Sequence, residues 1–239
     1  MADFAQRRGI TFPLLSDAGS TTIKRYGILN TTIPESAPLY GYPFPGTFFA
    51  NHDGVVTARF FEPTYQERDT VSSELARLGQ ASDQTVLRTT APHLEITSYL
   101  TDAVAAPGTH VSVVLDIRPA SHVHVYAPGA AGYRSVALNV EPQAGLIVRP
   151  ATFPKVDDYY FKPLNEHVPV YQRPFRLVQD LTIDPSRDAA AALRDRKTMT
   201  ISAALVYQAC DDTVCFNPQS VPLSWRIALR PLDTERVKK

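Results

Sequence analysis

The feature that most constrains the fold of this chain is a period-two alternation of apolar and polar residues that begins near residue 93. The clearest example runs through Val221, Leu223, Trp225, Ile227 and Leu229, with smaller or polar residues between them. Because successive side chains of a strand point to opposite faces, this pattern turns one apolar face toward a core. Several such short segments, separated by turn residues, predict an all-β, immunoglobulin-like sandwich over residues 93–235.

Residues 1–80 follow a different pattern, in which helix and strand signals alternate. Strands are expected at 47–50 and 55–61, because the intervening Asn-His-Asp-Gly sequence is typical of a hairpin turn. Helices are expected at 3–8, 20–26 and 64–78, the last with Val71, Leu75 and Leu78 on its buried face. These signals predict a small α/β module over residues 1–80, joined to the sandwich by a polar linker at 81–92. A short helix is also expected at 187–196, inserted between two strands of the sandwich.

Charge and composition exclude several kinds of partner. The 239 residues include 24 Lys+Arg and 24 Asp+Glu, so no net charge attracts nucleic acid or an anionic membrane. No segment approaches the roughly 18 consecutive apolar residues that a membrane-spanning helix needs, and the N-terminus lacks an apolar secretory segment. We therefore expect no nucleic-acid partner and no membrane span in this chain.

The two cysteines, Cys210 and Cys215, lie on either side of a four-residue connection that contains Asp211 and Asp212. A strand enters this connection and a second strand leaves it, which places the cysteines opposite each other at the end of a hairpin. Cα atoms of such a pair are about 4.5 Å apart, near the lower limit for a disulfide. A bridge at this position is expected to be strained and therefore easily reduced.

The residues alone leave three interpretations of this pair open. A redox-active disulfide is one, and a structural disulfide is the second, although so short a ring contributes only about 2 kcal/mol by loop-closure entropy. The third is a pair of inert thiols or half of a zinc site, for which C-x4-C without a second cysteine pair is weak support. We expect no metal site and no cofactor.

The sequence around the cysteines resembles a known family. The run Tyr207 to Asp212 (YQACDD), with Cys215 and Pro218 after it, is similar to the active hairpin of the periplasmic N-terminal domain of the thiol:disulfide interchange protein DsbD. Residues 122–129 (HVHVYAPG) resemble an early strand of the same family. The resemblance implies an immunoglobulin-like domain in which Cys210 and Cys215 are the catalytic pair. They would receive electrons from a thioredoxin-like protein and reduce a disulfide partner in the bacterial periplasm.

The same resemblance implies a loop that covers the cysteines with an aromatic side chain. The corresponding segment here contains Tyr159, Tyr160 and Phe161, and we expect one of these rings to shield the sulfurs until a partner displaces it. The alternative is that these aromatic residues only pack against an edge of the sandwich. Two differences from the family are the four-residue spacing between the cysteines, where the best-known member has five residues, and the absence of the electron-carrying membrane segment from this sequence.

Residues 1–80 resemble the C-terminal part of a redoxin of the AhpC/TSA, thioredoxin-like family. The resemblance is carried by residues 10–17 (ITFPLLSD), Tyr26-Gly27 and residues 45–56 (PGTFFANHDGVV). It implies that Pro45 is the cis-proline of a thioredoxin-like module. No cysteine occurs in residues 1–80, so no peroxidase activity is expected from them. We interpret them as part of a longer redoxin fusion, or as a docking module. Pairing with a second copy of the chain is one way to cover the sheet edges that an incomplete module exposes.

His122 and His124 alternate along one strand, a spacing that can bind copper or zinc, but exposed histidines on a strand are more often simply solvated. The function predicted from the sequence is therefore a thiol–disulfide oxidoreductase that relays electrons through Cys210 and Cys215. The alternative is a non-catalytic module that binds a partner and carries a structural disulfide.

Overall fold

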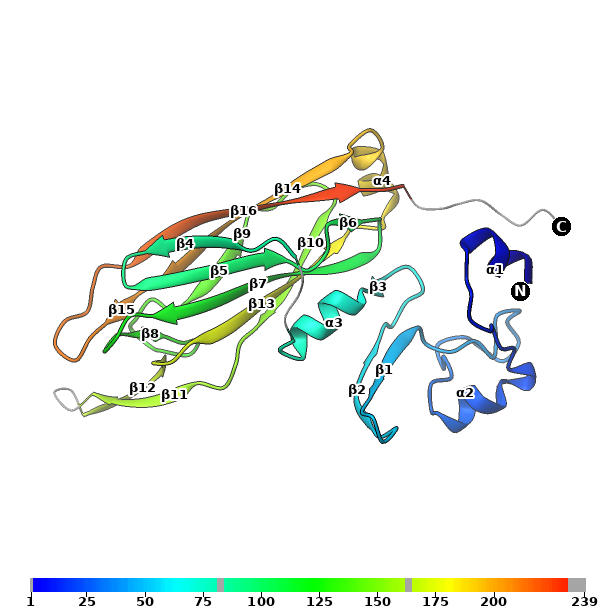
Figure 1. Ribbon diagram of the computed structural model, residues 1–239, viewed down its shortest axis with the longest axis horizontal. Coiled ribbons are helices and arrows are strands. Elements are labelled where there is room, and N and C mark those ends of the chain that lie inside the picture. Colours follow the sequence, from blue (N-terminus) through cyan, green and yellow to red (C-terminus); the bar gives the residue numbers. More distant parts are fainter. Residues whose placement is uncertain (1, 81–83, 162–164, 232–239) are drawn as a thin grey trace. The chain divides into compact units, whose positions relative to one another are not determined.

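The computed structural model describes residues 2–80, 84–161 and 165–231, and their contacts divide the chain into two compact units (Figure 1). Unit 1 comprises the described residues up to Arg68, and unit 2 runs from Asp69 to Pro231. The division lies ahead of the linker that was expected at residues 81–92. The reason is that the helix over residues 71–77 packs on the sheet of unit 2.

Unit 1 is a small α/β unit built around one hairpin. Its two strands pair in antiparallel register from Gly46 with Phe61 to Ala50 with Val56, which confirms the predicted hairpin. The turn forms because the Asn51 side chain accepts backbone N–H groups of Asp53 and Val55, while Gly54 takes a positive φ of 76°. Its elements are α1 (Ala2–Arg8), η1 (Ala18–Ser20), α2 (Thr21–Arg25), β1 (Gly46–Ala50) and β2 (Val56–Phe61), and β3 (Arg68–Asp69) spans the boundary of the units.

Unit 2 is mostly β-structure, as the period-two alternation predicts. Its strands in the first part of the unit are β4 (Leu87–Ala91), β5 (Leu94–Leu100), β6 (Val104–Ala105), β7 (Thr109–Pro119), β8 (His124–Tyr126), β9 (Ala137–Val140) and β10 (Leu146–Thr152). The later strands are β11 (Asp157–Phe161), β12 (Glu166–Tyr171), β13 (Phe175–Ile183), β14 (Thr198–Tyr207), β15 (Ala209–Cys210) and β16 (Gln219–Leu229). Two short helices complete the unit, α3 (Val71–Arg77) and α4 (Arg187–Leu193).

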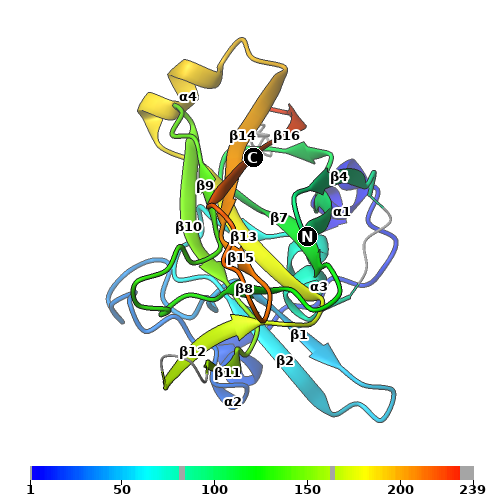
Figure 2. The same cartoon turned by 90° about the vertical axis from the view of Figure 1, so that its left-hand side faces the viewer.

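Two sheets enclose the main core of unit 2. One has the strand order β10-β13-β7-β5-β4 and the other β6-β16-β14-β9. Apolar residues of both sheets, such as Leu115 and Leu181 from the first and Ile201 and Ile227 from the second, belong to one buried cluster. A smaller sheet, β11-β12-β8-β15, lies at the end of the sandwich opposite α4 (Figure 1), and Figure 2 looks onto that end. The immunoglobulin-like topology and the thioredoxin-like nature of unit 1 stay predictions.

The third predicted helix is shorter than expected and buries a different face. It begins at Val71 instead of Thr64, because the Thr70 and Ser73 side chains form a capping box that fixes the start of α3. Val71 and Leu78 are exposed, whereas the buried face carries the small residues Ser73 and Ala76 together with Glu74. The expected apolar face was therefore wrong, because small side chains let this helix pack close to the sheet.

Part of the predicted linker is a strand. Residues 87–91 form β4, which pairs with β5 from Leu87 opposite Ser98 to Ala91 opposite Leu94. His93 takes a positive φ of 66° in the tight connection between them. The polar composition of this segment concealed a strand because β4 is at the edge of the sheet, where one side of the strand faces solvent. The inserted helix α4 was predicted correctly and is capped by the Ser186 side chain.

Candidate functional site

The two cysteines form a disulfide at the end of the hairpin made by β14 and β16. These strands pair in antiparallel register from Thr198 with Ala228 to Tyr207 with Gln219, and Cys210 and Cys215 form an isolated bridge beyond them. The Cα atoms of the two cysteines are 4.1 Å apart, close to the separation of directly opposed residues in a non-hydrogen-bonded antiparallel pair. The hairpin geometry expected from the spacing of the cysteines is confirmed.

The two sulfur-bearing residues differ in accessibility. Cys210 is 1% exposed, because it belongs to β15 and is covered by the neighbouring strand β8 and the residues packed on it. Cys215 follows the turn and is exposed. A molecule that approaches this disulfide from solvent therefore meets Cys215 first.

The connection between the cysteines is ordered by Asp211. Its Oδ1 atom accepts the backbone N–H groups of Thr213 and Val214 at 2.7 Å and the Thr213 hydroxyl at 2.8 Å. These backbone hydrogen bonds lower the pKa of Asp211, since they favour the ionised carboxylate. Asp211 thus stabilises the turn, and with Asp212 it keeps the surroundings of the disulfide negatively charged.

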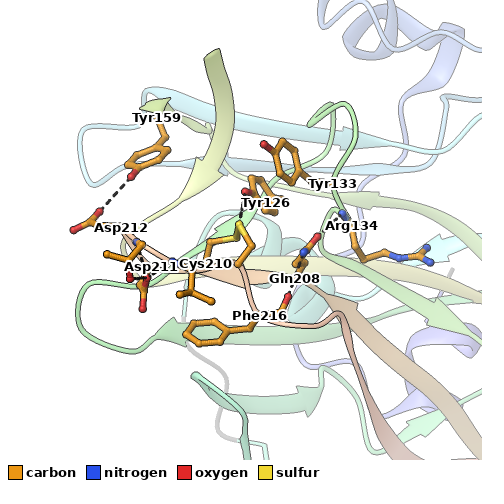
Figure 3. Close-up of a disulfide and its surroundings, with 12 residues drawn as sticks. Tyr126, Tyr133, Arg134, Tyr159, Gln208, Cys210, Asp211, Asp212 and Phe216 are labelled. Carbon is orange, nitrogen blue, oxygen red and sulfur yellow. Dashed lines mark hydrogen bonds between the residues drawn. A yellow bond between two sulfur atoms is a disulfide. The ribbon is translucent and has the colours of Figure 1, made fainter. Parts of the chain in front are cut away.

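Tyr126, on β8, is the side chain in closest polar contact with the disulfide. Its Oη atom lies 3.2 Å from Cys210 Sγ and 3.3 Å from Cys215 Sγ (Figure 3). Because a disulfide sulfur carries no hydrogen, the hydroxyl is the donor, and its single proton is shared between the two sulfurs. Tyr126 is only 4% exposed, and burial raises the pKa of its hydroxyl well above the ordinary value. This hydroxyl is therefore protonated across the neutral range.

A second tyrosine holds Tyr126 in place. The Tyr133 ring stacks on the Tyr126 ring with centroids 4.0 Å apart and planes inclined by 17°, and the Tyr133 hydroxyl donates to Glu166 Oε2 at 3.2 Å. Burial raises the pKa of Tyr133, and its hydrogen bond to Glu166 acts in the same direction. The stacked rings of Tyr126 and Tyr133 lie on one side of the disulfide (Figure 3).

Gln208 and Phe216 brace the base of the hairpin. The Gln208 side chain accepts the backbone N–H of Arg134 at 3.1 Å and donates to the Phe216 carbonyl at 3.2 Å. The Phe216 ring stacks on His93 with centroids 3.8 Å apart. These contacts connect the base of the cysteine hairpin to the loops that contain Arg134 and His93.

The three predicted cap residues lie on β11, which pairs with β12, and they do not share one environment. Tyr159 lies at the site: its hydroxyl donates to Asp212 Oδ1 at 3.2 Å (Figure 3). Its ring centroid is 4.4 Å from that of His124. Tyr160 points to the other face of the strand, where its hydroxyl donates to Asn165 and its ring lies beside His167. Phe161 is half-buried at the end of β11, opposite Glu166. Of these three side chains, Tyr159 is the one that contacts the loop between the cysteines in the described part of the chain.

His124 lies within the site, although the sequence suggested only a weak metal-binding pair for it. It is opposite Cys210 in the pairing of β8 with β15 and is 4% exposed. Burial lowers the pKa of its imidazole, and this effect exceeds the opposite effect of Asp212 and Asp211. His122 takes a positive φ of 61° and is exposed, so the two histidines do not present their rings to one site.

Pro45 belongs to unit 1, and its predicted cis peptide bond is not observed. The described residues contain no cis peptide bond, so Pro45 follows Phe44 through a trans bond, the isomer that X-Pro bonds prefer by about 0.5–1 kcal/mol. Its carbonyl accepts the Glu62 N–H at 2.9 Å, which extends the hairpin of β1 and β2. Pro45 here ends a strand pair, and the cis-proline assignment was wrong for this structure.

Sequence reasoning identified both cysteines but missed Tyr126, Tyr133 and Glu166 as members of the site. Tyr126 falls within the segment at 122–129 that carried the family resemblance, which was the one available signal. Tyr133 and Glu166 come from a loop and a strand far apart in the sequence, and only the folding of β8 against β12 brings them together.

Comparison with known proteins gives two family matches. Residues 98–222 match the N-terminal family of the thiol:disulfide interchange protein DsbD, and residues 1–59 match the AhpC/TSA family. No curated protein matches the chain significantly. No helix among the described residues has the length and apolar character required to cross a bilayer.

Solved structures of low sequence identity also resemble the chain. The reduced DsbD N-terminal domain of Neisseria meningitidis is 14% identical, with a TM-score of 0.33, and the match covers 49% of this chain and 81% of that one. The N-terminal periplasmic domain of ScsB from Proteus mirabilis is 14% identical, with a TM-score of 0.42, and 59% of this chain matches 51% of that chain. The chain thus spans about half the length of the ScsB domain. Since the DsbD match covers more than half of the sequence and includes both cysteines, the chain belongs to the family of DsbD N-terminal domains.

Proposed function

We propose that this chain is a thiol–disulfide oxidoreductase that relays two electrons from a thioredoxin-like donor to an extracytoplasmic disulfide partner. The observation that carries the proposal is the disulfide at the end of the hairpin made by β14 and β16. One of its cysteines, Cys210, is buried and the other, Cys215, is exposed. A disulfide that closes so short a ring contributes little to stability, whereas its exposed sulfur is well placed for exchange. Membership of the DsbD N-terminal family supports the same function.

In the proposed reaction, a thiolate of the donor attacks Cys215 Sγ. A bond forms between the donor sulfur and Cys215 while the bond between Cys215 and Cys210 breaks, and Cys210 takes the electron pair. The second thiol of the donor then attacks its own sulfur in this mixed disulfide and releases Cys215. The chain gains two electrons and two protons, and the same steps in reverse reduce the acceptor's disulfide.

Tyr159 has the role of a cap in this proposal. It reaches from β11 to Asp212 in the loop between the cysteines and covers His124, which is opposite Cys210. Displacement of this side chain by a partner would uncover Cys210, whereas Cys215 is exposed already, so the steps that involve Cys210 would depend on recognition. Tyr160 and Phe161 have no corresponding contact among the described residues, and we assign the cap to Tyr159.

The proposed location is the bacterial periplasm or another compartment outside the cytosol. A disulfide that persists in the resting protein belongs in an oxidising environment, and the similar ScsB domain is described as periplasmic. The proposed partners are a thioredoxin-like dithiol protein and a protein that carries a disulfide. A second copy of the chain, bound through unit 1, is a further proposed partner, and sedimentation measures this self-association.

The test combines a redox titration with trapping of mixed disulfides. The full chain is equilibrated with glutathione buffers. Each single-cysteine variant is first converted by oxidised glutathione to its mixed disulfide with glutathione, and is then incubated with a reduced thioredoxin-like protein that lacks its resolving cysteine, whose thiolate displaces glutathione. We expect a midpoint above about −300 mV and a mixed disulfide with the variant Cys210→Ser, in which Cys215 is retained. The variant Cys215→Ser should form little, because Cys210 is buried. A midpoint well below about −300 mV, with no mixed disulfide from either variant, would establish the alternative of a structural clasp.

A further inference from the structure

Reduction of this disulfide creates a negative charge on a buried sulfur atom. When a thiolate attacks the exposed Cys215, the electron pair of the broken bond goes to Cys210 Sγ, whose residue is 1% exposed. A buried thiolate is costly unless a hydrogen-bond donor or a positive charge stabilises it. The leaving sulfur therefore needs a partner that is already in place before the bond breaks.

The charged groups near the sulfurs do not supply that stabilisation. Asp211 and Asp212 directly follow Cys210 in the sequence and carry negative charge, which opposes a thiolate. His124, opposite Cys210, is buried, and burial lowers the pKa of its imidazole and keeps it neutral. Among the hydrogen bonds recorded for the described residues, the hydroxyl of Tyr126 is the donor placed against both sulfurs, at 3.2 and 3.3 Å.

We propose that Tyr126 is a catalytic residue whose hydroxyl donates a hydrogen bond to Cys210 Sγ as this sulfur leaves, an inference that rests on the proposed exchange function. The hydroxyl approaches the sulfurs while they are still joined, so it needs no rearrangement when the charge develops. Preorganised donors of this kind lower a barrier because they interact more strongly with the transition state than with the ground state.

The backbone and a second tyrosine keep Tyr126 in this position. β8 pairs with β15 through Val125 with Ala209 and His124 with Cys210, so the strand that carries Tyr126 is hydrogen-bonded directly to the strand that carries the leaving sulfur. The ring of Tyr133 stacks on Tyr126 and is itself held by Glu166. Tyr133 and Glu166 are therefore positioning residues.

The test uses the full chain and a small dithiol, dithiothreitol, as the attacking reagent. The rate of disulfide reduction is measured by stopped flow for the wild type, Tyr126→Phe and Tyr171→Phe. Tyr171 is a matched control, because it is also buried and its hydroxyl donates to a backbone carbonyl, that of Pro154, away from the sulfurs. We expect Tyr126→Phe to slow reduction about tenfold or more, the loss typical of one hydrogen bond to a charged group, and Tyr171→Phe to stay within about twofold.

A second readout separates this role from simple packing. In the Cys215→Ser background, the thiol of Cys210 is titrated by its thiolate absorbance, with and without Tyr126→Phe. We expect the pKa of Cys210 to rise by about one unit or more when the hydroxyl is absent. Equal reduction rates for both phenylalanine variants, or an unchanged Cys210 pKa, would overturn the proposal. Since dithiothreitol replaces the protein donor, failure of the chain to exchange with thioredoxin-like proteins would refute the proposed relay and leave this result standing.

Discussion

Replacing Tyr159 with alanine should expose the buried sulfur, and replacing Tyr160 with alanine should not. The two residues are adjacent on the same edge strand, but their side chains point to opposite faces. The Tyr159 hydroxyl donates to Asp212 and its ring lies 4.4 Å from His124, whereas Tyr160 contacts Asn165 and His167. Comparing Tyr159→Ala with Tyr160→Ala therefore distinguishes the loss of the cap from the general effect of removing a tyrosine side chain from this strand.

The size of the effect follows from the two contacts of Tyr159. A net hydrogen bond contributes about 1 kcal/mol, and an aromatic contact contributes about another 1 kcal/mol. Together they hold the closed position of the cap by about 2 kcal/mol. Since about 1.4 kcal/mol corresponds to a factor of ten, the open population should rise about 30-fold in Tyr159→Ala.

The assay is alkylation of Cys210 in the Cys215→Ser background, where Cys210 is the sole thiol. Pseudo-first-order rates with iodoacetamide are followed by mass spectrometry for the parent, Tyr159→Ala and Tyr160→Ala. We expect Tyr159→Ala to react about 30-fold faster and Tyr160→Ala to stay within about twofold of the parent. If Tyr159→Ala were no faster than Tyr160→Ala, Tyr159 would not shield the sulfur, and the aromatic residues of β11 would serve only to pack the edge of the sheet.

Two further predictions concern stability. Burial lowers the pKa of His124 in the folded chain. Neutral His124 therefore makes its full contribution to the free energy of unfolding above the ordinary pKa of about 6.5, and this contribution is lost as the pH falls through the lower pKa of the folded state. The urea midpoint of unit 2 should therefore fall between about pH 7 and pH 5.5, and His124→Gln should flatten that dependence; an equal slope in the variant would contradict this origin. Replacing both cysteines with alanine should lower the free energy of unfolding by about 2 kcal/mol or less, whereas Ile201→Ala, at a fully buried core position, should lower it by about 2–5 kcal/mol. Urea denaturation measures both, and a larger loss from the cysteine pair would indicate a structural disulfide.

The hairpin that carries the disulfide could be predicted because its signals are local. Asp211 and Asp212 are turn residues, and alternation in the flanking strands sets which residues oppose each other across the hairpin. The predicted opposition of Cys210 and Cys215 follows from these short-range effects alone. The β1–β2 hairpin of unit 1 was predictable for the same reason, since its turn is closed by the side chain of Asn51.

Errors occurred where packing overrides local preference. The helix α3 buries the small residues Ser73 and Ala76 together with Glu74 instead of its larger apolar residues, and the two small side chains allow its close approach to the sheet. The polar segment 87–91 became a strand because β5 offered it an edge to pair with. Neither outcome can be inferred from periodicity, since both depend on a neighbouring surface that the local sequence does not contain.

The amino-acid sequence by itself determined that the second part of the chain is β-structure and that its two cysteines face each other across a turn, because strand alternation and turn chemistry act over a few residues. The tertiary structure decided which sulfur is buried, which aromatic residue reaches the loop between the cysteines, and that Tyr126 contacts both sulfurs. These features arise where β8, β11, β12 and β15 meet, and contacts between strands so far apart in the sequence exist only after the sheet has assembled.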